Sequence, residues 1–419
     1  MTFTFDRSWG RAAWAALPLA LVAVLTAATA IEAAPARSSA AEAIDAGRAA
    51  LVKGDGIAAE VDLRKALASG VSEDRLAAYL GEAYLQQKDY DSARQWLGPE
   101  NFSPDQRQHG YHMLARLELA SGNVQAANAA FEKALAGNQG TAEIWVDIGR
   151  MRYDNGQQHQ ALEASLKALE RDSKNPRALE FRGQLLRDSE GLLAALPWFE
   201  RGLKVAPDDI GLLGEYAATL GELGRASEML RVTRHMIELD GKNPRAFFLQ
   251  AVMAARAGDY VLARRMLLRT EDKLDDQPAK TLLEGILEMQ SGNWGLAVEA
   301  LDGLSRQQPD NVPVAEIMGR ALLENGDARE VVERYAPLAD GPDASPYMLT
   351  LVGRAYEALG DRNAAAAYLD RSGIAKADAL IVIPAGPQGE MAIFRGKDDP
   401  YRLDAGVALP IGEQEALHR

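Results

Sequence analysis

The stretch AEIWVDIGRMRYDNGQQHQALEASLKALERDSKN, residues 142–175, decides the fold of this chain. Four residues of its first half recur at spacings of three and four, which places them on one face of a helix: Trp145, Ile148, Gly149 and Arg152. Residues 154–156 break that helix, and a second run of helical spacing begins at Gln158 and ends ahead of Pro176. The stretch therefore predicts two helices joined by a short turn, an αα-hairpin.

This hairpin recurs every 34 residues without an insertion. The place of Gly149 has a small residue in every copy: Gly47, Gly81, Ala115, Gly183, Ala217, Ala251, Gly285, Gly319 and Gly353. The turn position of Gly156 is glycine in most copies, with Lys88 and Glu190 as departures, and the position of Ala161 is alanine except at Met229 and Val331. Small residues let neighbouring helices approach closely, and the turn glycine adopts a conformation that side chains resist. The three series predict a stack of similar hairpins.

The period and its small and aromatic landmarks resemble the tetratricopeptide repeat, in ten copies over about residues 40–373. The copy at residues 244–277 is close to the family pattern, whereas the copy at residues 210–243 departs from it at Met229. The resemblance implies an all-α fold, a right-handed α-solenoid superhelix of helix-turn-helix hairpins. We therefore expect three parts: residues 1–36 as an export segment, residues 37–373 as one elongated solenoid domain, and residues 374–419 as a C-terminal tail.

The composition excludes several classes of function. A hydrophobic content of 47% with 6% aromatic residues fits a stack rich in alanine and leucine and argues against general disorder. The formal net charge of −14 makes a nonspecific grip on nucleic acid or on anionic lipid unfavourable. With no cysteine, the chain has no thiolate metal site, disulfide or cysteine nucleophile, and no N-terminal cysteine to lipidate.

The N-terminal segment predicts export. Arg7 and Arg11 precede an apolar run, residues 12–30, that Pro18 interrupts only mildly. Residues 28–30 and 34–36 both fit a signal-peptide cleavage pattern, and the run is also just long enough to span a bilayer uncut. A cleaved signal peptide and an inner-membrane anchor both remain open. Either one places the repeats in the periplasm, because the arginines precede the apolar run.

The tail contains two β-like runs, Leu380 to Ile383 and Met391 to Phe394, on either side of a segment rich in proline and glycine. This pattern predicts a small β-hairpin or an extended wrap. A terminal repeat leaves one apolar helix face uncovered, so we expect the tail to cap the last hairpin, which ends near Gly373.

The sequence offers little support for catalysis. His109 and His112 are spaced like two metal ligands on a helix, but no third ligand recurs nearby, so we predict no metal and no other cofactor. Neither a G-x-S-x-G elbow nor a phosphate-binding G-x-x-x-x-G-K loop is present. We therefore expect a protein that is not an enzyme, although an active site can also be assembled from residues distant in sequence.

Arginine recurs directly after the small residue of the first helix: Arg48, Arg116, Arg150, Arg320 and Arg354. In the family that the chain resembles, this flank lines a groove that binds peptides, and arginine there can hold an acidic segment or a free C-terminus. The alternative is pairing within each helix, for which carboxylates stand nearby: Asp45 for Arg48, Asp154 for Arg150, Glu316 and Glu324 for Arg320, and Glu357 for Arg354. Arg116 has no carboxylate three or four residues away, which makes it the strongest candidate ligand.

Other copies have apolar residues on this flank: Phe248, Val252, Leu282, Ile286 and Met289. They form either an apolar section of the groove, of the kind that binds proteins, or part of the helix packing. Periodicity does not separate the two alternatives.

The function predicted is a non-catalytic periplasmic scaffold that mediates protein–protein interactions in bacterial envelope assembly. The resemblance suggests exopolysaccharide export, pilus or secretion-system assembly, or outer-membrane biogenesis. The partners expected are proteins or peptide segments, acidic or C-terminal in character, and not nucleic acid. The alternatives are a chaperone-like holder of unfolded client tails and, less favoured, an enzyme with an unrecognised site.

Overall fold

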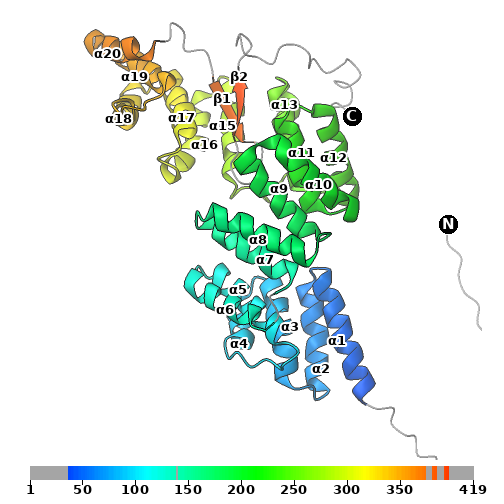
Figure 1. Ribbon diagram of the computed structural model, residues 1–419. Helices are drawn as coiled ribbons and strands as arrows, with labels where there is room; N and C mark the ends of the chain where they lie inside the picture. Colours follow the sequence, from blue (N-terminus) through cyan, green and yellow to red (C-terminus); the bar gives the residue numbers. More distant parts are fainter. Residues whose placement is uncertain (1–35, 138–139, 374–379, 385–390, 396–419) are drawn as a thin grey trace, which may run out of the picture. The chain divides into compact units, whose positions relative to one another are not determined.

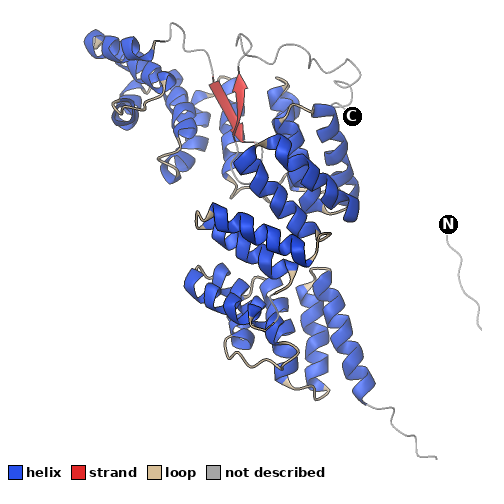
Figure 2. Cartoon of the chain, in the orientation of Figure 1, coloured by secondary structure: helices blue, strands red, loops and turns tan. Residues whose placement is uncertain are grey.

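The computed structural model describes residues 36–137, 140–373, 380–384 and 391–395 (Figure 1). In these residues twenty helices follow one another along the chain, and two strands come after them (Figure 2). The first helices are α1 (Ala36–Val52), α2 (Gly56–Ala68), α3 (Glu73–Gln86) and α4 (Tyr90–Leu97). The next are α5 (Arg107–Ala120), α6 (Val124–Leu135), α7 (Ala142–Asp154), α8 (Gln158–Arg171), α9 (Pro176–Glu190), α10 (Leu192–Val205), α11 (Ile210–Glu222) and α12 (Ala226–Leu239). The last are α13 (Pro244–Arg256), α14 (Tyr260–Leu268), α15 (Pro278–Gln290), α16 (Trp294–Gln307), α17 (Val312–Asn325), α18 (Ala328–Ala339), α19 (Pro346–Ala358) and α20 (Arg362–Ser372), followed by β1 (Leu380–Pro384) and β2 (Met391–Arg395).

The chain divides into two compact units, Met1–Trp96 and Leu97–Arg419, whereas the periodicity alone favoured one solenoid domain. The division falls at the end of α4, just before Pro99 and Pro104 lengthen the connection to the next hairpin. Proline removes a backbone donor and fixes φ, so this connection does not continue the regular turn of the other repeats.

The turns follow the predicted glycine series. Gly156 has a φ of 74°, in the left-handed region that a side chain disfavours. Lys88 adopts the same conformation, with a φ of 60°, although it is not glycine. Glu190 is the other position of the series that is not glycine. There α9 continues through Glu190, and the next residue, Gly191, has the positive φ of 96°. The turn is therefore kept at Lys88 at the expense of backbone strain and displaced by one residue at Glu190.

The small-residue position is where the first helix of a repeat packs against a large side chain. A Cβ added to Gly183 would lie 2.5 Å from the ring of Phe199, on the second helix of the same repeat. A Cβ on Gly285 would lie 2.5 Å from Leu301, in the corresponding place. Any larger residue would force the two helices apart, which explains why the series contains only glycine and alanine.

Two layers of helices make up the second unit. From α7 onward, each odd-numbered helix packs against the even-numbered helices before and after it. Each odd-numbered helix from α5 to α17 also contacts the next odd-numbered helix, as α7 does with α9 and α17 with α19. The odd-numbered helices thus lie closer together and form the inner layer of a curved stack. We call the surface of this layer that faces away from the even-numbered helices the inner face.

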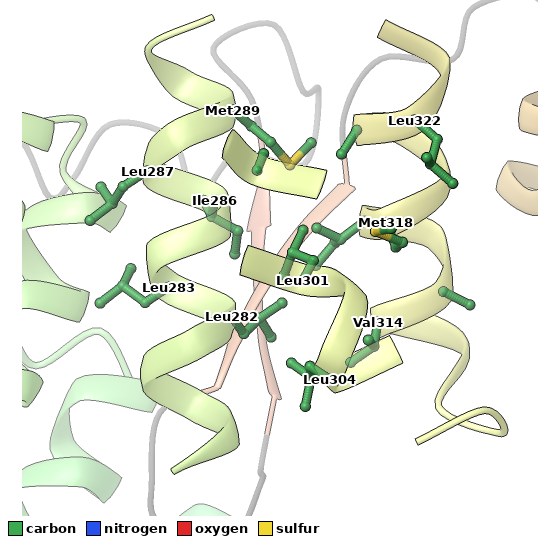
Figure 3. Packing of buried hydrophobic residues seen from close by; sticks show 14 of the residues in the cluster. Leu282, Leu283, Ile286, Leu287, Met289, Leu301, Leu304, Val314, Met318 and Leu322 are labelled. Atoms are coloured by element: carbon green, nitrogen blue, oxygen red, sulfur yellow. The ribbon is translucent and has the colours of Figure 1, made fainter. Parts of the chain in front are cut away.

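A large apolar core extends from α13 to α19 (Figure 3). Leu282, Ile286 and Met289 leave α15 on the side of α17, whereas Leu283 and Leu287 leave it on the opposite side. All five side chains are buried.

Strands β1 and β2 pair antiparallel, with Val382 opposite Ile393. The main contacts of β1 with helices are with α15 and α17. The tail was expected to cap the last hairpin, α19–α20; apart from β1 and β2 the tail lies outside the described residues, so the cap stays a prediction.

None of the helices among the described residues is long and apolar enough to cross a membrane. The predicted export segment, residues 1–36, lies outside the described residues except for Ala36.

Candidate partner-binding face

Four of the five predicted arginines lie on the inner layer of the second unit: Arg116 on α5, Arg150 on α7, Arg320 on α17 and Arg354 on α19. Arg48, on α1, belongs to the first unit, where its guanidinium lies 3.9 Å from Asp45 and 5.6 Å from the ring centre of Tyr79. The side chains of Arg116, Arg150 and Arg354 are 40%, 35% and 49% exposed. Solvent, and hence a partner, can reach these three.

Arg116 is not unpaired as the sequence suggested. Its Nε lies 3.8 Å from the carboxylate of Asp147, which is on α7 in the next repeat. Asp147 is only 9% exposed and has two closer partners, His112 Nε2 at 2.8 Å and Arg177 Nη2 at 2.9 Å. The sequence search missed this partner because it covered only carboxylates within one helix, whereas Asp147 comes from the neighbouring one.

Asp147 thus joins three successive inner helices, α5, α7 and α9. Burial raises the pKa of its carboxyl, but the hydrogen bond from His112 and the charges of Arg177 and Arg116 outweigh burial and lower the pKa to about 2. The group is therefore ionised at neutral pH. Because a carboxylate only accepts hydrogen bonds, His112 donates to it from Nε2.

A second buried carboxylate, two repeats further along the chain, also joins three successive inner helices. Glu215 on α11 accepts hydrogen bonds from Arg187 at 2.8 Å and from Arg245 at 2.6 Å, on α9 and α13. Burial raises the pKa of Glu215, and the two arginines lower it below its usual value overall. Asp147 and Glu215 stand 68 residues apart, and so do Arg177 and Arg245, which is twice the repeat period. The sequence analysis missed this recurrence, although the 68-residue spacing of both pairs can be read from the sequence.

The local pairs predicted from the sequence form at two of four arginines. Arg48 meets Asp45, and Arg354 donates to Glu357 at 2.7 Å. Arg150 instead lies 3.6 Å from Glu180, on the next inner helix, so the predicted pair with Asp154 is wrong.

Among the described residues, Arg320 forms no ion pair with Glu316 or Glu324, and its charge acts on Tyr347. Burial raises the pKa of Tyr347, and the charge of Arg320 opposes that shift. Glu316 accepts a hydrogen bond from Ser345, and burial raises its pKa. Nη1 of Arg320 is buried and has no hydrogen-bond partner in the part of the chain that the structure describes.

A small cavity opens on the inner face beside Arg150. It has a volume of about 70 Å³ and is lined by side chains of α7 and α9, among them Arg150, Phe181 and Gln184. The guanidinium of Arg150 lies 5.5 Å from the ring centre of Phe181, and its Nε has no hydrogen-bond partner within the described residues.

The apolar candidates are all buried: Phe248 6%, Val252 3%, Leu282 2%, Ile286 0% and Met289 4% exposed. They belong to the core cluster of α13–α19, so they do not form the open apolar groove that was one of the two alternatives. Of the two candidate metal-binding histidines, His112 is bonded to Asp147. Among the described residues, no three His, Cys, Asp or Glu side chains converge as ligands for a metal ion.

A family model described as the tetratricopeptide repeat matches residues 44–97, 112–176 and 146–210. Residues 44–97 and 112–210 of the chain thus match the tetratricopeptide repeat. Tetratricopeptide repeats generally bind proteins or peptides and are generally non-catalytic. The inner face described above is where this tetratricopeptide-repeat protein exposes arginines at the repeated position.

Several solved structures of tetratricopeptide-repeat proteins are similar to parts of the chain. PilF of Pseudomonas aeruginosa is 20% identical, with a TM-score of 0.40, over 49% of this chain and 91% of the other. PilW, a type IV pilus biogenesis factor, is 17% identical, with a TM-score of 0.44, over 52% and 99%. A thermophilic tetratricopeptide-repeat protein of Thermus thermophilus is 19% identical, with a TM-score of 0.40, over 43% and 98%. No curated protein matches the sequence.

Proposed function

We propose that this tetratricopeptide-repeat protein is a non-catalytic scaffold that faces the periplasm of a Gram-negative-type bacterium and holds a protein partner during assembly of the cell envelope. The observation that supports it most is the inner face of α5 and α7. There Arg116 and Arg150, one repeat apart, are partly exposed: Arg116 lies beside Asp147, and Arg150 lines the cavity.

This arrangement favours an acidic segment as the partner. A guanidinium binds a carboxylate through two parallel hydrogen bonds, and the spacing of successive repeats lets two arginines contact one extended segment. The ion pairs between repeats support binding indirectly, because they hold both arginines on a rigid surface.

Removing the charge of Arg116 tests this proposal. In Arg116→Gln, Asp147 keeps His112 and Arg177 as partners, so folding should change little, while an acidic partner should bind about tenfold more weakly. Arg152→Gln is the matched control, because Arg152 is on α7, carries the same charge and donates to the backbone of Gln160.

The measurement is capture of partners by full-length protein from native membranes in mild detergent, followed by mass spectrometry. One complex of fixed stoichiometry, weakened by Arg116→Gln and not by Arg152→Gln, would support the scaffold. Many substoichiometric clients would favour a chaperone-like holder, and equal capture by both variants would rule out the arginine contact. The same experiment distinguishes pilus assembly from exopolysaccharide export, secretion and outer-membrane biogenesis.

Location is tested separately. Protease added to spheroplasts should digest the repeats while cytoplasmic markers survive. Protected repeats would contradict a periplasmic location.

A further inference from the structure

The position directly after the small residue of the first helix is exposed to solvent in α7 but buried in α13 and α15. Arg150, Val252 and Ile286 occupy equivalent places, separated by multiples of the 34-residue period. The side chain of Arg150 is 35% exposed, whereas Val252 and Ile286 are 3% and 0% exposed. Ala218, at the same place on α11, is 1% exposed, so close packing of a small residue also closes the flank. Val252 and Ile286 are larger and belong to the helix core of α13–α19, and Ile286 is on α15, a helix that also contacts β1.

Strand β1 is in position to cover this part of α15. Its main contacts are with α15 and α17, which are neighbours in the inner layer, while α16 packs against both of them from the other side. A segment that contacts α15 and α17 opposite α16 lies on the inner face. Figures 1 and 3 show the two strands beside these helices.

The chemistry of the two partners matches. The strip on α15 consists of aliphatic and thioether side chains: Leu282, Ile286 and Met289. The strand sequences, LIVIP and MAIFR, are apolar except for Arg395. A two-stranded hairpin is at best marginally stable alone in water, so packing against such a strip is what would keep it folded.

We propose that the β1–β2 hairpin is a built-in occupant of the inner face at α15 and α17, and that it covers the apolar strip of α15 until it is displaced. An apolar partner segment would gain this section of the inner face only by competing with the hairpin. The open section at α5–α7 would bind without that competition. The proposal does not depend on which partner the scaffold holds.

Thiol labelling tests the proposal, because the natural chain has no cysteine and each introduced cysteine is the only one. Three single-cysteine variants of the full-length protein are compared: Ile286→Cys under the hairpin, Leu283→Cys on the opposite side of the same helix, and Arg150→Cys on the open flank. Each is made with the natural tail and with Ile381→Pro and Val382→Pro together. Adjacent prolines remove a ladder donor whichever of the two residues is hydrogen-bonded to β2.

With the natural tail, the cysteines at 286 and 283 should label slowly and the one at 150 quickly. The two prolines should speed labelling at position 286 about tenfold or more and leave positions 283 and 150 unchanged. Labelling at 286 that stays as slow as at 283 after strand pairing is lost would overturn the proposal, because the helices alone would then bury the strip.

If the two prolines also loosen α15 itself, faster labelling at position 283 will reveal this. In that case a second variant, which changes the helix instead of the strand, tests the proposal. Ile286→Asp places a charge under the hairpin and leaves the tail sequence intact. Hydrogen exchange of the amides of residues 380–384 should then become about tenfold faster or more than in an Arg150→Asp control. Unchanged exchange in Ile286→Asp would contradict the proposal.

Discussion

The buried carboxylate of Asp147 gives the sharpest prediction of stability. Asp147→Asn keeps the size and one acceptor of the side chain but removes the charge that His112, Arg177 and Arg116 surround. The pKa of Asp147 is lowered from 3.8 to about 2, which is worth about 2 kcal/mol of preference for the ionised form in the folded state. Because asparagine resembles the protonated acid, the variant should be less stable than the natural protein by about 2 kcal/mol at pH 7.

The sign of the pH dependence follows from the same shift. A carboxyl whose pKa is lowered on folding contributes its full stability above the unfolded value of 3.8 and loses it as the pH falls towards 2. The difference between the natural protein and Asp147→Asn should therefore be constant from pH 7 to about pH 5, shrink through pH 4 and 3, and nearly vanish by pH 2.

Urea unfolding followed by circular dichroism at each pH measures this difference, and hydrogen exchange of the α7 amides localises it. Asp310→Asn is the control, because Asp310 is exposed and its replacement should leave the unfolding curve unchanged. Equal stability of Asp147→Asn and the natural protein at pH 7, or a difference that persists at pH 2, would refute the inferred role of the cluster.

Two further predictions concern the turn residue and the small residue that recur in each repeat. Lys88→Gly should stabilise the turn between α3 and α4 by about 1 kcal/mol, because it relieves a left-handed backbone at a side-chain residue, and slower hydrogen exchange in α3 would show it. Gly285→Val should destabilise the α15–α16 hairpin by about 1–3 kcal/mol, because its Cβ would lie 2.5 Å from Leu301, and a melting temperature equal to that of the natural protein would contradict the packing argument.

The arginines show where sequence reasoning reached its limit. The pairs Arg48–Asp45 and Arg354–Glu357 were predictable, because residues three apart on a helix are neighbours whatever surrounds them. The partners of Arg116 and Arg150 lie 31 and 30 residues further along the chain, on the next inner helix. Such contacts depend on how the repeats stack.

The sequence by itself determined the repeat: the 34-residue period, the helix pairs, the small residue at Gly285 and the turn at Gly156. These features are local and recur along the chain, so a single chain supplies several independent observations of each. Only the tertiary structure decided that Asp147 and Glu215 bridge successive inner helices, that Ile286 is buried, and that β1 lies against α15 and α17. Those outcomes depend on the distance and angle between repeats and on the path of the tail, which residue spacing within one helix does not specify.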